Sequence, residues 1–295
     1  MTDPVDSAAS QPSALTPYKA WIAAWPLLLG FAVLAIPTVR SLGEAVWTTE
    51  AGAHGPIIVF TGAWLVMRQA ESFKAGSPGS IWITLPWLVA SLALYALARA
   101  FDYISLEVLG LYSTGLAMAY SCFGAKPLIK NWFPLVYLGF LAPPPGWLID
   151  GFTAPLKQFV SFVATESLSL VGLPVAREGV TIFVAEYQLL VEDACSGLNS
   201  LVGLTAVSLF YIYLLRGAYL RYALLLTAFV LPIAVAGNIV RIMVLILLTY
   251  FYGDAVAQSF LHAMAGLFLF VIDLLLVFAV DSLLVRILPK SWHSK

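Results

Sequence analysis

Long apolar runs are the feature that most constrains what this chain can fold into. They recur along the whole sequence, and at a rise of 1.5 Å per residue a run of roughly 16 to 25 residues crosses a hydrocarbon core of about 30 Å. Only 11% of the residues are charged, whereas soluble domains carry about 25%. A water-soluble globule is therefore excluded, and no basic patch indicates nucleic-acid binding. The sequence predicts an all-α polytopic membrane protein.

The apolar runs predict about eight transmembrane helices in a single membrane domain over residues 18–295. Residues 1–17 are polar, rich in Ser, Ala and Pro, and lack the pattern of a signal peptide, so we expect a disordered cytoplasmic tail. No Pro/Gly/Ser-rich linker divides the remainder. The expected spans cover roughly residues 20–42, 56–70, 80–100, 103–123, 130–145, 196–215, 221–245 and 262–285.

The basic residues indicate how these spans are oriented. With the amino terminus in the cytoplasm, ten of the fifteen Lys and Arg fall on the inner side. Because short cytoplasmic loops are enriched in Lys and Arg, both termini are expected inside. To keep the last basic residues inside, the stretch 244–258 is expected to be a re-entrant or interfacial piece. The five basic residues on the outer side are Arg40, Arg99, Lys157, Arg177 and Arg241.

A more polar stretch at about 144–194 predicts a small cap on the outer face of the membrane. Residues 147–171 place apolar side chains at spacings of three and four, which is typical of an amphipathic helix at the membrane interface. Residues 175–183 and 186–191 then resemble two short strands separated by a turn, a β-hairpin.

The strongest local motif is Ala194-Cys-Ser-Gly-Leu198, where the cap ends and a span begins. A thiol at a helix N-terminus meets unpaired N–H groups and the positive end of the helix dipole, and both stabilise a thiolate. Ser196 and Gly197 allow backbone donors to approach a developing oxyanion. A buried, inert cysteine is the alternative.

Cys122 is expected on the opposite membrane face, beyond the Cα separation of about 7 Å that a disulfide allows. Cys195 is then an unpaired thiol in an oxidising compartment, which favours a function.

Two further residues are expected at the same leaflet. Asn238 and Arg241 share a helical face, and Arg241 lies about 30 Å along a helix that begins near Arg221. His262 opens the last span and could act as a general acid or base. Each has a plain alternative, namely an arginine that snorkels to lipid headgroups and a capping histidine. Cys195, Arg241 and His262 together are the residue types that activate a thiol nucleophile: a thiol, a cation that stabilises negative charge, and an acid/base.

Rival functions follow from the same residues. A transporter or channel would use Arg241, His262 and Asp273 as pathway residues, and a structural or scaffolding subunit of a membrane complex would need no reactive thiol. An intramembrane aspartyl protease built on Asp273 and Asp281 is weaker, since these lie eight residues apart on one helix; neither is assigned a role. No cofactor or metal is indicated, because the three histidines, His54, His262 and His293, are not at ligand spacing.

The chain resembles the exosortase/archaeosortase family over most of its length after residue 45. The blocks that carry the resemblance occur in the same order as in that family. They are Trp47 with His54-Gly55, Pro143-Pro144-Pro145, Gly172-Leu-Pro-Val175, Gly179-Val-Thr-Ile182, Ala194-Cys-Ser-Gly-Leu198, Asn238-Ile-Val-Arg-Ile242, and His262 with Gly266.

The resemblance implies a cysteine transpeptidase or protease in a bacterial inner membrane, with its active site facing the periplasm and a link to exopolysaccharide production. Its substrates would carry a carboxy-terminal PEP-CTERM tail, made of a Pro-Glu-Pro motif, a transmembrane helix and a basic cluster. Cys195 would be the nucleophile, His262 the acid/base, and Arg241 the stabiliser of thiolate or oxyanion. Many members carry a basic residue at the position of Asn199. Some relatives have a fused periplasmic domain, so any such accessory protein is expected to be separate here.

Overall fold

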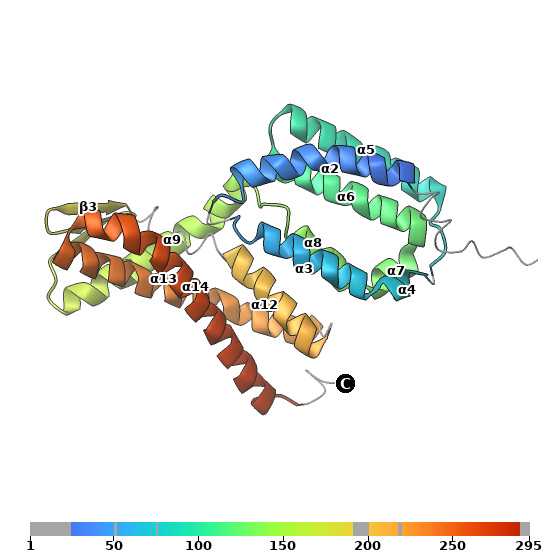
Figure 1. The fold of residues 1–295 in the computed structure, drawn as a ribbon. Coiled ribbons are helices and arrows are strands. Elements are labelled where there is room, and N and C mark those ends of the chain that lie inside the picture. The colour runs from blue at the N-terminus through green and yellow to red at the C-terminus, as the bar shows by residue number, and fades with distance from the viewer. Residues whose placement is uncertain (1–24, 50–51, 75, 191–200, 218–219, 290–295) are drawn as a thin grey trace, which may run out of the picture.

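The computed structural model describes residues 25–49, 52–74, 76–190, 201–217 and 220–289 (Figure 1). The described chain is mostly helical, with one small antiparallel sheet. Its elements are α2 (Trp25–Ala45), α3 (Gly55–Arg68), α4 (Ala70–Lys74), α5 (Ile81–Ala100), α6 (Ile104–Phe123), α7 (Ala125–Lys130), α8 (Trp132–Gly139), α9 (Gly146–Leu170), β1 (Val175–Glu178), β2 (Thr181–Val184), β3 (Tyr187–Leu190), α12 (Leu201–Arg216), α13 (Leu220–Tyr252) and α14 (Asp254–Ile287).

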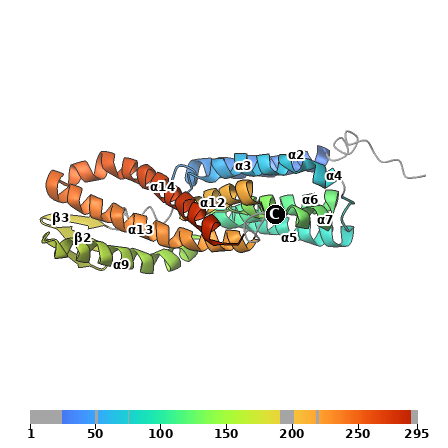
Figure 2. The same cartoon turned by 90° about the horizontal axis from the view of Figure 1, so that it is seen from below.

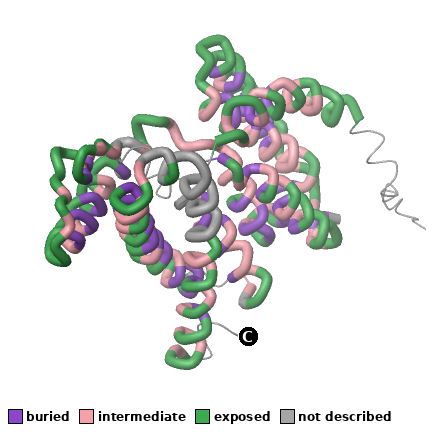
Figure 3. Tube along the Cα trace, turned by 60° about the vertical axis from the view of Figure 1, so that its left-hand side comes forward, coloured by how far each residue is buried: buried purple, intermediate pink, exposed green. Residues whose placement is uncertain are grey.

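The molecule is elongated, and its two ends differ in construction (Figures 1 and 2). Helices α2, α3, α5 and α6 lie roughly parallel at one end, whereas α9, the sheet and the tips of α13 and α14 form the other. Of the helices that are described throughout, α2, α5 and α13 are long and apolar enough to cross a membrane. Exposed residues follow the outward helix faces (Figure 3), and they include large apolar side chains such as Trp82 and Phe60. Such outward apolar faces are typical of helices in contact with lipid.

A buried polar network joins α2, α5 and α6. Glu107 is buried and accepts hydrogen bonds from Thr38 Oγ1 at 2.7 Å and from Arg99 Nη1 at 2.6 Å. Tyr95 adds a hydrogen bond from its hydroxyl to the carbonyl of Leu34. Ionised groups among apolar helices are tolerated when they are paired, so this network fixes the three helices relative to one another.

The span expected over residues 130–145 is wrong. This region holds the eight-residue helix α8, which ends at Gly139, and α7 ends at Lys130, where the span was expected to begin. The break falls at Asn131, whose side chain donates to the carbonyl of Pro127. Pro134 lies in the next turn and has no amide proton for the carbonyl four residues earlier. The two helices pack against α3, α4 and α6 rather than forming one long span.

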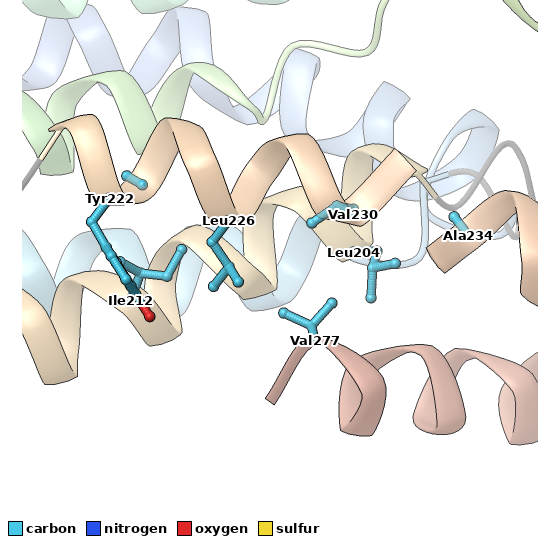
Figure 4. Packing of buried hydrophobic residues seen from close by; sticks show 8 residues of the cluster. Leu204, Ile212, Tyr222, Leu226, Val230, Ala234 and Val277 are labelled. Carbon is cyan, nitrogen blue, oxygen red and sulfur yellow. The ribbon is translucent and has the colours of Figure 1, made fainter. Parts of the chain in front are cut away.

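Helices α13 and α14 form a long antiparallel hairpin that turns at Gly253, where φ is +83°. The interfacial piece expected at residues 244–258 is therefore wrong: α13 continues to Tyr252 and α14 begins at Asp254. No proline or glycine interrupts α13 after Gly237, so nothing in the backbone ends the helix at the membrane boundary. The lower half of the hairpin packs on α12 through the cluster in Figure 4, which includes Leu204, Leu226 and Val277.

The cap contains α9 and a three-stranded meander of order β1-β2-β3. The helix agrees with the expected residues 147–171. The two-strand expectation is wrong, because residues 175–183 fold back on themselves at Gly179, where φ is +61°. One face of the cap buries Val160, Ile182 and Val184 against Ile242 and Ile246 of α13. The cap and the outer half of α13 thus share one hydrophobic core.

Candidate functional site

Arg241 and Asn238 lie on α13 at the junction between the apolar helices and the cap. Arg241 is only 2% exposed and Asn238 is also buried. The next residue, Ile242, already belongs to the core shared with α9 and β2. Buried guanidinium groups are rare unless they are paired or functional. The structure thus supports a buried arginine rather than one that snorkels to headgroups.

The length of α13 gives the distance between Arg221 and Arg241 along the helix. Twenty residues separate Arg221 from Arg241 in an uninterrupted helix, which corresponds to about 30 Å. The whole helix has 33 residues and is about 50 Å long. Since this exceeds a hydrocarbon core of about 30 Å, α13 is longer than one membrane crossing requires, and the position of Arg241 near the outer boundary stays a prediction.

The carboxyl group of Asp273 on α14 lies against Gly237 on α13. A Cβ placed on Gly237 would overlap Asp273 Oδ1 and lie 2.8 Å from Oδ2. In an α-helix, positions four apart lie on the same face, so Gly237 and Arg241 both face α14. Arg241 is one turn further out than the Asp273 contact.

His262 lies within α14, and the structure describes its backbone and not its side chain. Eleven residues separate it from Asp273, so at 100° per residue the two positions fall about 20° apart around the helix. The face of α14 that meets Gly237 therefore also carries position 262. Antiparallel pairing puts this position about one to two turns further out than Arg241.

Cys195, Ser196 and Gly197 lie outside the described residues. The chain enters their segment from Leu190, the end of β3 in the cap, and leaves it at Leu201, the start of α12. The structure thus brings Asn238, Arg241 and the His262 position to one hairpin, and leaves their distance from the thiol a prediction.

His54 is a residue for which the sequence indicated no role. Its imidazole lies against the first turn of α12, since a Cβ on Gly203 would be 2.9 Å from Nδ1. Burial lowers the pKa of His54 from its usual value, so the ring is neutral near pH 7. The signal that could have found it is its place before Gly55-Pro56, at the N-terminus of α3.

Asp273 and Asp281, the two carboxylates in the apolar part of α14, lie in different surroundings. Asp281 is buried and accepts hydrogen bonds from Tyr222 at 2.5 Å and from Tyr211 at 3.2 Å, which ties α12, α13 and α14 together. It lies about 12 Å along the helix from Asp273, too far for a catalytic pair of carboxylates. Among the described residues no three His, Cys, Asp or Glu side chains gather closely enough to hold a metal ion.

The apolar helices, taken with the family match, define a multi-pass membrane protein. The chain belongs to the transmembrane exosortase family, whose model (Exosortase_EpsH) matches residues 46–279, more than half of the chain. Members of this family are cysteine transpeptidases that process PEP-CTERM proteins. No match was found among curated proteins or among solved structures.

Proposed function

We propose that this chain is a membrane-embedded cysteine transpeptidase or protease that removes carboxy-terminal PEP-CTERM sorting signals from exported proteins. The observation that carries the proposal is the burial of Arg241 where the apolar helices meet the cap. A fixed cation at this level can stabilise negative charge developing just outside the hydrocarbon core. The proposed location is a bacterial inner membrane, with both termini cytoplasmic and the site facing the periplasm.

The proposed reaction begins with the thiolate of Cys195. Its sulfur attacks the carbonyl carbon of the scissile peptide bond, and Arg241 with backbone N–H groups, including those near Ser196 and Gly197, holds the oxyanion. The C–N bond breaks while His262 donates a proton to the leaving amine of the tail. The sorted protein remains bound to Cys195 as a thioester.

A second nucleophile completes the reaction. An amine or water attacks the thioester carbon, His262 takes up its proton, and the C–S bond breaks to regenerate the thiolate. An amine gives transfer and water gives hydrolysis. Asn238 shares the buried stretch of α13 with Arg241 and is proposed to support it.

A cleavage assay in cells tests this proposal. A reporter with a PEP-CTERM tail is co-expressed with the wild-type enzyme, with Cys195→Ala or with Cys122→Ala, and its length is followed on a gel. The chain has two cysteines, and Cys122 is exposed, so Cys122→Ala is the matched control. We expect the wild type and Cys122→Ala to shorten the reporter and Cys195→Ala to leave it intact. Equal shortening by Cys195→Ala would rule out a thiol nucleophile; no shortening by any variant would favour the transport or scaffolding alternatives.

A further inference from the structure

His54 is a side chain that the proposed reaction does not use, and its imidazole contacts α12. A Cβ placed on Gly203 would lie 2.9 Å from Nδ1 of His54 and 3.0 Å from its Cγ. Well-packed side chains do not approach so closely, so a methyl group at position 203 would displace the ring. Glycine at this position of α12 thus makes room for the imidazole.

The backbone of His54 is held from both sides. Its carbonyl oxygen accepts a hydrogen bond from the amide of Ile58 at 3.1 Å, in the first turn of α3. The amide of the next residue, Gly55, donates to the carbonyl of Gly52 at 2.9 Å. Gly55 also packs beneath the indole of Trp47, which any side chain at position 55 would overlap. The imidazole therefore projects from a fixed part of the connection between α2 and α3.

The start of α12 is packed between α3 and the hairpin of α13 and α14. Gly203 contacts His54 at the N-terminus of α3. The next residue, Leu204, packs in the same cluster as Val277 of α14 (Figure 4). Along the chain, α12 is the first described element after Cys195. The contact of His54 thus lies where the segment that carries Cys195 joins α12.

A histidine in this contact makes the contact depend on protonation. Burial lowers the pKa of His54, so the ring is neutral near pH 7. The only charged residues of α3 and α12 are Arg68 and Arg216, each at the opposite end of its helix. Glu44 near the end of α2 is exposed and bonds to Arg40. An imidazolium would thus lack an anionic partner among these described groups, and a buried unpaired charge is costly.

We propose that His54 is a positioning residue for the thiol chemistry, acting through Gly203. Its imidazole sets the position of the start of α12, and with it the end of the segment that carries Cys195, without touching the substrate. A protonated ring would leave this contact, so the neutral ring is the form that positions α12. This inference rests on the proposed function, because it assigns His54 a role in that same site.

Kinetics of the purified full-length enzyme on the tailed reporter test the proposal. We expect His54→Ala and Gly203→Ala each to lower kcat about 10- to 100-fold, as a small misplacement of a reacting group does. KM should stay unchanged, because neither residue contacts substrate. The matched control is Gly30→Ala on α2, where no atom lies within 4 Å of the added methyl, and it should keep the wild-type kcat. Wild-type kcat in both test variants would overturn the proposal.

A double-mutant cycle tests the contact itself. In His54→Ala the ring is gone and only the Cβ remains, 3.2 Å from a Cβ placed on Gly203, so a small shift accommodates the methyl of Gly203→Ala. The double variant should then be no slower than His54→Ala alone, whereas independent effects would multiply. Multiplied losses would show that the two residues act separately, against the proposal.

The pH profile separates positioning by the neutral ring from simple packing, and it decides the question even if His54→Ala fails to fold. Between about pH 5 and 8, kcat of the wild type is divided by kcat of His54→Gln, whose amide does not titrate. Ionisation of His262 is common to both enzymes and cancels in this ratio.

We expect a ratio of about ten at the alkaline end, falling toward one as the imidazole gains a proton. The fall should lie below the usual pKa of histidine, because burial lowers the pKa of His54. A ratio that stays constant over this range would show a packing role only and overturn the proposal. Should Cys195→Ala still process the reporter, the proposed function fails instead.

Discussion

Arg241→Lys is expected to lower the rate of reporter processing about 100- to 1,000-fold, the loss that follows removal of one preorganised oxyanion donor. Lysine keeps the charge but not the planar fork of donors, so it cannot hold an oxyanion in the same geometry. The effect should be large because Arg241 is buried, where solvent does not screen its field.

The matched control for this substitution is Arg221→Lys, an exposed arginine near the start of the same helix. It should retain the wild-type rate. Both variants should reach the membrane at wild-type abundance, measured by quantitative blotting. If Arg241→Lys processed the reporter within about threefold of the wild-type rate, less than 1 kcal/mol of barrier, Arg241 would have no part in the chemistry.

Ile246→Ala is expected to have the largest effect on stability. Its side chain is fully buried in the core that joins α13 to α9 and β2. Truncating a buried isoleucine to alanine typically costs about 2 to 5 kcal/mol, since the cavity is only partly refilled. At about 2 to 4 °C per kcal/mol for a chain of this size, the Tm in detergent should fall by about 5 to 15 °C.

This substitution also tests whether the cap supports the site. Because Ile246 lies about a turn beyond Arg241 on α13, loosening this core should reduce processing below the temperature at which the protein unfolds. Val244→Ala, at an exposed position on the same helix, is the control and should change neither property. Identical Tm values for the two variants would contradict the packing of the cap on α13.

Apolar periodicity predicted the helices well where no tertiary contact competed with it. The expected spans at 80–100 and 103–123 agree with α5 and α6, and the expected amphipathic helix agrees with α9. The predicted sheet lacked one strand because the turn at Gly179 falls inside the stretch 175–183, which was expected to be a single extended strand. Here a positive φ at glycine, rather than the hydrophobic pattern, decides the chain direction.

The two errors in the membrane part have different physical causes. The expectation of an interfacial piece at 244–258 assumed that a helix ends where the bilayer ends. In the structure the cap supplies packing partners for Ile242 and Ile246, so α13 continues to Tyr252. Conversely, α8 has only eight residues and ends at Gly139, shortly before the run Pro143-Pro144-Pro145, in which no residue has an amide proton to continue a helix.

The sequence predicted which residue types form the candidate site, but it did not predict the contacts between helices that surround them. Arg241 is buried, while its outer level stays a prediction. The contact between Asp273 and Gly237 joins residues 36 positions apart, and no spacing rule reveals it. The same holds for His54 and Gly203. Such contacts depend on how helices pack, which a single sequence does not specify.

Interception of the acyl-enzyme tests the central claim most directly. The purified enzyme processes the tailed reporter in the presence of hydroxylamine, and the new carboxy terminus is determined by mass spectrometry. A thioester on Cys195 predicts a hydroxamate at the cleaved end, and no cleavage at all by Cys195→Ala. A free carboxylate alone, formed at a rate that hydroxylamine and Cys195→Ala leave unchanged, would contradict covalent thiol catalysis.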